Sequence, residues 1–362
     1  MRIAVLGVGL IGGSIGLAAR QRLEAEVVGF DPDPGTLDRA GEDRAIDRGA
    51  STVAEACEGA EVVFCAAPVA GLPELATAAL AACGPETVVT DVGSTKRDIV
   101  AALGADERFI GGPPLAGAET SGVENARADL FEGARWYLTP KSARSSGLLY
   151  DRLQRTVTGL GARVQAIDAE AHDRLMATIS HLPHVVANVL VGQAVEELTR
   201  DSERMPEVGP SFRDTTRVAG ANPAIWGDIF ASNREAVAEA VDGVVERLRE
   251  AAALIREGER DAVAAWHAEA GSDRRRLLET ELAGGPLREL RVVVANRPGT
   301  IAELALALGE AGVNIEDMAL YPAPDMTSGA VSLWVSGDEQ AERAASLVRR
   351  LGHSVSAVGN GG

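Results

Sequence analysis

The segment from residue 3 to residue 31 limits the fold of this chain more than any other part of the sequence. A short apolar run leads into Gly7, Gly9 and Gly12, a helix-forming segment follows, and a second apolar run ends on Asp31. In a strand–turn–helix unit of this kind, the first glycine permits a tight turn and the second lets the backbone approach a pyrophosphate. The third lets the helix pack closely on the strand. The segment therefore predicts a dinucleotide-binding α/β fold.

The acid at the end of this segment indicates which dinucleotide binds. Asp31 lies about twenty residues after the glycine turn, where a carboxylate accepts the ribose 2′-hydroxyl and favours NAD over NADP. A secretory signal is the alternative explanation for the uncharged run at residues 3–19, but five glycines in that run disfavour a signal helix. We expect NAD to be held by this turn and by two residues that follow the strand at residues 61–66: Gly7, Gly9, Leu10, Ile11, Gly12, Asp31, Ala67 and Pro68.

Charge and composition argue against several classes of protein. The net charge of −18 disfavours nucleic acids and anionic membranes as partners. The three cysteines lack metal-binding spacing, which predicts reduced thiols in a soluble, cytoplasmic protein. We expect no further apolar run of the ~20 residues that span a membrane. His172, His181 and His184 could form a metal site, but no cluster of acids or cysteines accompanies them, so none is expected.

The pattern of apolar residues predicts three domains. Residues 1–168 alternate short apolar strands with helical segments, as a Rossmann-like parallel α/β sheet requires. Residues 169–283 contain long helices, typical of an all-α lobe that builds a substrate pocket and a dimer interface. Residues 287–362 follow a Gly-Gly-Pro linker in the order β-α-β-β-α-β, which is typical of an α+β ferredoxin-like module. The strands expected in the first domain after residue 60 are at 61–66, 87–90, 108–111, 135–139 and 163–167.

Five motifs in the right order resemble the prephenate dehydrogenase family, including its arogenate-using members. They are the glycine turn, DVGSTK at residues 91–96, the glycine- and proline-rich residues 111–122, SHLPH at residues 180–184, and Arg217 followed by Trp226. The tail motifs NRPG (296–299) and GVNI (312–315) resemble an ACT domain. The resemblance implies NAD-dependent oxidative decarboxylation of prephenate to 4-hydroxyphenylpyruvate in tyrosine biosynthesis, by a homodimer with a regulatory tail.

The resemblance also implies roles for individual residues. Ser94 orients the substrate hydroxyl and the nicotinamide, and it could also cap the helix that follows. Arg217 binds a substrate carboxylate, a task for which a bidentate guanidinium is well suited. His184 lines the substrate pocket with His181, Trp226 and Glu119, although a core histidine and a solvated loop acid are the structural alternatives. In the tail an aromatic amino acid binds between paired units near Asn296, Pro298, Gly299, Gly312 and Asn314, unless the tail serves only for dimerisation.

One position departs from the family motif. The family reads Gly-Gly-His-Pro-Met/Leu-Ala-Gly, and its histidine is credited with accepting the proton of the 4-hydroxyl; here Pro113 stands at that position. Proline has no proton-accepting side chain, and general-base catalysis contributes ~10²–10⁴ in rate. We therefore expect binding of NAD and prephenate with slow turnover, unless His184 reaches the same hydroxyl.

Three other functions fit parts of the sequence. Arogenate is an alternative substrate within the family. An enzyme for an amino analogue of prephenate could dispense with the family's histidine, because an amine at C4 needs a different proton acceptor. A catalytically inactive protein that binds NAD and a regulatory amino acid would not need a base. A β-hydroxyacid dehydrogenase has a similar two-lobe plan, but it relies on a lysine in the helical lobe, and residues 169–199 contain no lysine.

Overall fold

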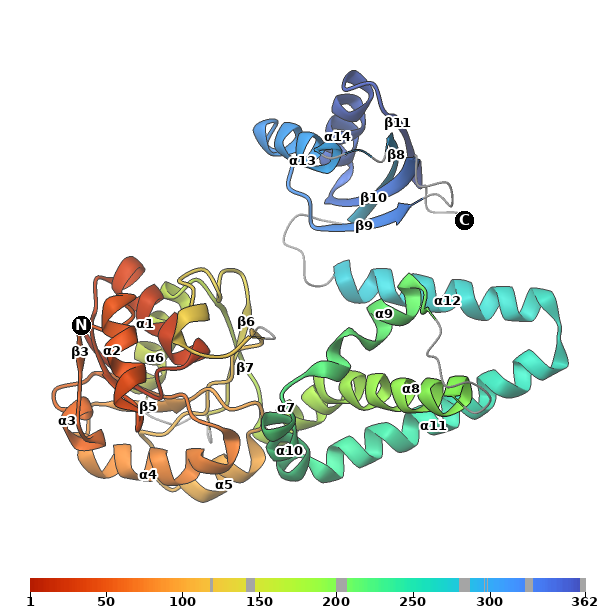
Figure 1. Ribbon diagram of the computed structural model, residues 1–362. Helices are drawn as coiled ribbons and strands as arrows, with labels where there is room; N and C mark the ends of the chain where they lie inside the picture. The colour runs from red at the N-terminus through yellow and green to blue at the C-terminus, as the bar shows by residue number, and fades with distance from the viewer. Residues whose placement is uncertain are drawn as a thin grey trace. The chain divides into compact units, whose positions relative to one another are not determined.

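The computed structural model describes residues 1–117, 120–140, 147–199, 207–279, 287–295, 297, 299–322 and 328–358 (Figure 1). The chain forms two compact units, Met1–Leu248 and Arg249–Gly362. The first unit contains the nucleotide-binding sheet and most of the helices that follow it. The second contains the end of a long helix, one further helix and a small antiparallel sheet.

A five-stranded parallel sheet organises the first unit, in the order β3-β2-β1-β4-β5. Its central strand β1 is buried on both faces, as expected for a parallel sheet covered by helices. Ile3 and Val5 belong to one core cluster, while Ala4 and Leu6 belong to the other. The predicted Rossmann-like sheet is confirmed. The strands are β1 (Arg2–Leu6), β2 (Glu26–Phe30), β3 (Arg48–Gly49), β4 (Val62–Cys65) and β5 (Val88–Asp91).

Helices cover both faces of this sheet (Figure 1). Buried side chains of α1 and α6 join the cluster of Ile3 and Val5. Those of α3, α4 and α5 join the cluster of Ala4 and Leu6 on the opposite face. The helices of this part are α1 (Leu10–Leu23), α2 (Pro34–Glu42), α3 (Val53–Cys57), α4 (Leu72–Ala82), α5 (Arg97–Leu103) and α6 (Gly147–Gly159).

The strand predicted at residues 108–111 is wrong as a continuous strand. Only isolated bridges form there, from Val89 to Phe109 and from Gly111 to Thr139. The N–H of Gly112 donates to the Asp91 carboxylate, and Pro113 and Pro114 have no N–H with which to extend a ladder of hydrogen bonds. The carbonyl of Pro113 still accepts a hydrogen bond of 3.0 Å from the Tyr137 N–H. The segment therefore connects the main sheet to a separate parallel pair, β6 (Arg135–Leu138) and β7 (Arg163–Ala166).

Helices make up the rest of the first unit, as predicted for the residues after 168. A π-helical turn, Ala177–His181, connects α7 to α8 without a break. The helix α11 begins in the first unit and ends in the second. The helices are α7 (Ala169–Met176), α8 (Leu182–Thr199), α9 (Pro210–Thr216), α10 (Pro223–Ser232), α11 (Arg234–Glu257) and, in the second unit, α12 (Arg260–Glu279).

One helical stretch contradicts the expectation that no further long apolar run exists. The helical stretch Ala169–Glu197 is long and apolar enough, by length and composition, to cross a membrane. In its most apolar segment of 18 residues, 22% is buried within the protein. The run at residues 175–195 contains no Asp, Glu, Lys or Arg, and the histidines within it obscure its apolar character. A single helix of this kind is weak evidence for a membrane, because helices covered by other protein have the same composition.

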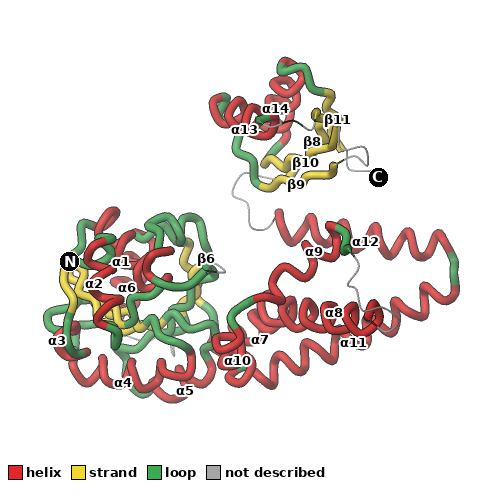
Figure 2. The backbone as a smooth tube through the Cα atoms, in the orientation of Figure 1, coloured by secondary structure: helices red, strands yellow, loops and turns green. Residues whose placement is uncertain are grey.

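The second unit ends in a four-stranded antiparallel sheet of order β11-β8-β10-β9. Figure 2 shows its two helices on the same side of the sheet, where Leu304 and Val348 pack against Val292 and Val331. The second strand begins at Asp317 rather than at residues 313–315, where we expected it. The elements are β8 (Leu287–Ala295), α13 (Thr300–Glu310), β9 (Asp317–Pro322), β10 (Ser328–Ser336), α14 (Asp338–Arg350) and β11 (Ser354–Val358).

Candidate active site

The glycine turn between β1 and α1 has the geometry that a dinucleotide requires. Gly7 has φ +95°, and a Cβ there would lie 2.4 Å from the Ala66 carbonyl oxygen. A Cβ on Gly12 would lie 1.9 Å from the Gly7 carbonyl oxygen. Gly9, in contrast, has open space where its Cβ would be, with no atom within 4 Å. The middle glycine thus leaves room for a pyrophosphate at the N-terminus of α1, where free N–H groups favour an anion.

The predicted ribose-binding acid lies beside this turn. The carboxylate of Asp31 accepts a hydrogen bond of 2.9 Å from the Val8 N–H and one of 3.0 Å from the Asp33 N–H. These contacts fix the carboxylate at the carboxyl end of β2, and a carboxylate has further lone pairs for a ribose hydroxyl. The turn and the acid therefore fit an NAD molecule.

A cavity of about 640 Å³ opens beside the glycine turn, at the carboxyl ends of β4 and β5. The side chains that line it come from the nucleotide-binding part and from α7, the π-helical turn and α10. It brings together nine of the predicted site residues: Gly9, Leu10, Ile11, Ala67, Pro68, Ser94, Pro113, His181 and Trp226.

Other predicted residues do not line this cavity. His184 lies behind Trp226, with the two ring centroids 3.5 Å apart and the planes at 27°. Arg217 begins a short 3₁₀ turn after α9 and is exposed. Gly7, Gly12 and Asp31 support the turn from outside the cavity. Glu119 lies outside the described residues, as do Asn296 and Pro298 of the tail.

A buried ion pair holds the two loops that carry Ser94 and Pro113. Lys96 and Asp91 pair through Nζ and Oδ2, and both side chains are fully buried. The Asp91 carboxylate also accepts from the Gly93 N–H at 2.8 Å and from the Gly112 N–H at 3.3 Å. One aspartate thus links the loop after β5 to the segment before Pro113. The DVGSTK motif is visible in the sequence, but this role of Asp91 is not.

The helix α5 is capped by a residue distant in sequence and not by Ser94. Lys96 occupies the cap position, and the N–H groups of Lys96 and Arg97 donate to the Asp173 carboxylate at 2.7 and 2.8 Å. Ser94 is exposed and lines the cavity. The alternative role of Ser94 as a helix cap is therefore wrong, and its hydroxyl is available to a ligand.

Two histidines beside the cavity are almost completely buried. Nδ1 of His172 lies 2.9 Å from Oδ1 of Asp173, and Nδ1 of His181 lies 3.2 Å from Nδ2 of Asn233. Burial lowers the pKa of His181 to about 4, so its ring is neutral near pH 7. Within the described part of the chain, Nε2 of each ring has no hydrogen-bond partner. The sequence pattern suggested His172 only as a possible metal ligand and gave no signal for Asp173 or Asn233.

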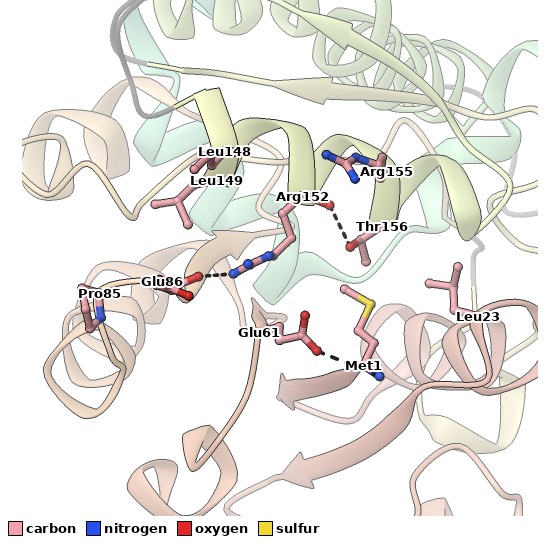
Figure 3. A pocket seen from close by; sticks show the side chains of 10 residues that line it. All are labelled: Met1, Leu23, Glu61, Pro85, Glu86, Leu148, Leu149, Arg152, Arg155 and Thr156. Carbon is pink, nitrogen blue, oxygen red and sulfur yellow. Dashed lines mark hydrogen bonds and ion pairs between the residues drawn. The ribbon is translucent and has the colours of Figure 1, made fainter.

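A second cavity, of about 620 Å³, lies at the opposite, amino-terminal edge of the sheet (Figure 3). Met1 precedes β1, Glu61 precedes β4 and Glu86 precedes β5. Arg152 donates to the Glu86 carbonyl across this space. Ligands of open α/β sheets bind at the carboxyl ends of the strands, so the first cavity is the candidate active site.

Fold and site together define a dinucleotide-dependent dehydrogenase with a helical substrate-binding part. Two family models match: the nucleotide-binding domain of prephenate dehydrogenase at residues 15–166 and its dimerization domain at residues 168–269. The chain belongs to the prephenate dehydrogenase family, which confirms the resemblance.

Individual relatives agree with this family. The prephenate dehydrogenase of Bacillus subtilis (strain 168) is 29% identical over 94% of this chain and 94% of its own length. A crystal structure of prephenate dehydrogenase from Aquifex aeolicus, in complex with hydroxyphenyl propionate and NAD+, has 30% identity and a TM-score of 0.72. The match covers 76% of this chain and 98% of the Aquifex aeolicus chain. The arogenate dehydrogenase of Synechocystis has 26% identity and a TM-score of 0.67, with 76% and 100% covered.

Proposed function

We propose that this chain catalyses the NAD-dependent oxidative decarboxylation of prephenate to 4-hydroxyphenylpyruvate in tyrosine biosynthesis. The observation that carries the proposal is a cavity lined by Gly9 of the glycine turn, Ser94, His181 and Trp226. NAD+, when bound, supplies the acceptor for the hydride that leaves C4 of the substrate. Ser94 orients the substrate hydroxyl, and Arg217 binds a carboxylate of the substrate.

Arogenate is the second candidate substrate, because the Synechocystis relative is an arogenate dehydrogenase. The two substrates differ in the side chain, which bears a keto group in prephenate and an amino group in arogenate. NADH formation should be measured by absorbance with prephenate, with arogenate and with the amino analogue of prephenate. Turnover of prephenate at the highest kcat/KM is the expected result. NAD binding without turnover of any of the three would contradict the proposal and favour a regulatory protein.

The role of Arg217 can be tested against a neighbouring arginine. Arg217→Ala should raise the KM for prephenate by ~10²-fold or more, because a charge-assisted bidentate contact is lost. The matched control is Arg213→Ala, four residues earlier in α9 and also exposed, which should leave KM within about threefold. A parallel fall in NAD affinity in the Arg217 variant would show that the residue is structural.

A homodimer accounts for the apolar helix α8, and we place the protein in the cytoplasm. Val189, Leu190 and Val195 are 63%, 37% and 42% exposed in the isolated chain, and the matched family model describes a dimerization domain. Apolar side chains that are exposed together on one helix of a single chain indicate that a second protein chain covers them. Light scattering after gel filtration should give twice the chain mass of 37.6 kDa. Val189→Asp should shift the mass toward the monomer, and an unaltered monomer would contradict the proposal.

The antiparallel sheet of the second unit acts as an ACT domain that binds an aromatic amino acid. The element order β-α-β-β-α-β and the strand order support a ferredoxin-like module. Gly299 and Gly312 have φ of +92° and +72°, Asn314 is exposed, and a cavity of about 100 Å³ lies beside the buried Thr300 hydroxyl. Calorimetry with tyrosine and phenylalanine should give heat that disappears on truncation after Gly284. If neither amino acid binds, the proposal of a regulatory site is refuted, and dimerisation remains as the function of this sheet.

A further inference from the structure

The two buried histidines of the cavity have opposite hydrogen-bonding partners. His172 faces a carboxylate, which can only accept a hydrogen bond, whereas His181 faces the Nδ2 atom of Asn233. Both rings line the cavity, and in the described chain both Nε2 atoms are buried without a partner. An imidazole held at Nδ1 presents Nε2 on the far side of the ring. The tautomer of each ring therefore decides what its Nε2 offers to a ligand.

Asn233 fixes the tautomer of His181. Its Nδ2 also donates to the Asp173 carbonyl oxygen at 2.8 Å, and a carbonyl accepts only. The amide is therefore oriented with its NH₂ group toward both partners, and Nδ1 of His181 accepts. Since the pKa of His181 is lowered to about 4, the neutral ring carries its proton on Nε2. The Nε2–H of His181 is therefore a donor on a ring that lines the cavity.

Asp173 fixes the opposite tautomer of His172. Its carboxylate accepts from the Lys96 and Arg97 N–H groups at 2.7 and 2.8 Å, which hold it in place. Nδ1 of His172, at 2.9 Å from the same carboxylate, therefore donates its proton. The lone pair of the neutral ring is then on Nε2. A carboxylate behind an imidazole is the arrangement that orients a general base.

We propose that Nε2 of His172 accepts the proton of the substrate 4-hydroxyl in this chain, in place of the side chain that Pro113 lacks. Asp173 acts as a positioning residue, and His181 donates a hydrogen bond to an oxygen of the bound ligands. The inference rests on the proposed function. It replaces His184, the candidate suggested by the sequence, because that ring stacks on Trp226 and does not line the cavity.

The proton and the electrons balance in this step. The C4–H bond breaks as the hydrogen leaves with its electron pair as a hydride, for which NAD+ would be the acceptor. The O–H bond breaks as its proton passes to His172, and its electron pair forms the C4=O bond. The bond between C1 and the ring carboxylate then breaks, CO₂ leaves, and its electron pair enters the ring. The C4 oxygen becomes a phenolate and takes the proton back from Nε2. The base thus ends in its starting state.

The decisive variant is His172→Gln, assayed by NADH formation with prephenate. It should lower kcat by ~10²–10⁴-fold, the range for removal of a general base, while NAD affinity stays within about threefold. The matched control is His267→Gln, an exposed histidine of α12 in the second unit, and kcat should stay within about threefold. Pro113→His in the His172→Gln chain supplies a new acceptor and should restore at least about tenfold of the lost rate.

The pH dependence of the unaltered protein gives a second measurement that does not depend on folding of a variant. In the described part of the chain, Asp173, Tyr137 and His181 are titratable groups that interact with His172. The pKa of His181 is lowered to about 4, so a loss of kcat/KM on the acid side between about pH 5 and 8 does not come from His181 and indicates another base in the site. A flat profile across that range would overturn the inference.

The remaining outcomes separate this inference from the proposed function. Turnover by the unaltered protein that persists in His172→Gln would refute only the inference. A loss of kcat in His184→Gln but not in His172→Gln would assign the base to His184. That result would also refute the inference. Failure of the unaltered protein to oxidise prephenate, with NAD still bound, would refute the proposed function and the inference with it.

Discussion

Lys96 provides a direct test of how the cavity is held together. Lys96→Met removes the cation but keeps the length and most of the apolar stem of the side chain. Asp91 then remains fully buried, with the Gly93 and Gly112 N–H groups as its hydrogen-bond donors in the described structure. Removing one partner of a buried ion pair costs about 3–5 kcal/mol, because the other charge remains without compensation. We expect a loss of unfolding free energy in this range.

The assay is denaturation by urea, followed by circular dichroism. The chain has two units, so the transition of the nucleotide-binding part is identified by its shift when NAD+ is added. The matched control is Arg97→Met. Arg97 is the adjacent residue, its ion pair with Glu235 at 2.8 Å is partly exposed, and exposed pairs contribute about 0–1 kcal/mol.

A second substitution tests the physical reason for the loss. Asp91→Asn in the Lys96→Met chain removes the uncompensated charge and should recover part of the lost stability. It cannot recover all of it, since the amide keeps one oxygen for the two N–H groups that donate to Asp91. A loss below about 1 kcal/mol in Lys96→Met, or no recovery in the double variant, would refute this account of the ion pair.

Three further predictions follow from the turn and from the buried histidine. Gly9→Ala should fold normally and weaken NAD binding, whereas Gly12→Ala should lower the melting temperature, because its Cβ would lie 1.9 Å from a carbonyl oxygen; calorimetry measures both, and the reverse pattern would contradict the geometry. Asp31→Ser with Pro32→Arg should move the preference of kcat/KM from NAD toward NADP, and equal use of both by the unaltered protein would exclude a role for Asp31. Because the folded-state pKa of His181 is lowered to about 4 from 6.5, the unfolded chain binds the proton more readily, and up to about 3 kcal/mol of stability should be lost as the pH falls from 6.5 to 4. His181→Gln should flatten this part of the pH profile of urea denaturation.

Local patterns explain what the sequence could predict. The glycine turn, the strands around it and Asp31 are specified within about thirty residues, because each glycine has a steric reason to be there. The change from short strands to long helices near residue 168 was equally clear. The prediction of a strand at residues 108–111 was wrong, although the apolar pattern there is that of a strand. The prolines at positions 113 and 114 lack the N–H groups that would continue the ladder.

Contacts between distant residues explain what the sequence could not predict. Asp173 is next to His172 in the chain, but it is held by Lys96, 77 residues earlier. Asn233, which fixes the tautomer of His181, contacts Asp173 across 60 residues. No spacing rule connects these positions. The sequence therefore pointed to three histidines as candidates, but it could not show that a carboxylate faces His172 and an amide faces His181.

The hydrogen bonds that hold the chain at positions 112 and 113 are made by backbone groups on this segment and do not involve the side chain of residue 113. The Pro113 carbonyl accepts from the Tyr137 N–H at 3.0 Å, and the preceding Gly112 N–H donates to Asp91 at 3.3 Å. Neither bond depends on which residue stands at 113, and no N–H is required there. A substitution at this position therefore changes the chemistry of the cavity wall and leaves both backbone hydrogen bonds in place.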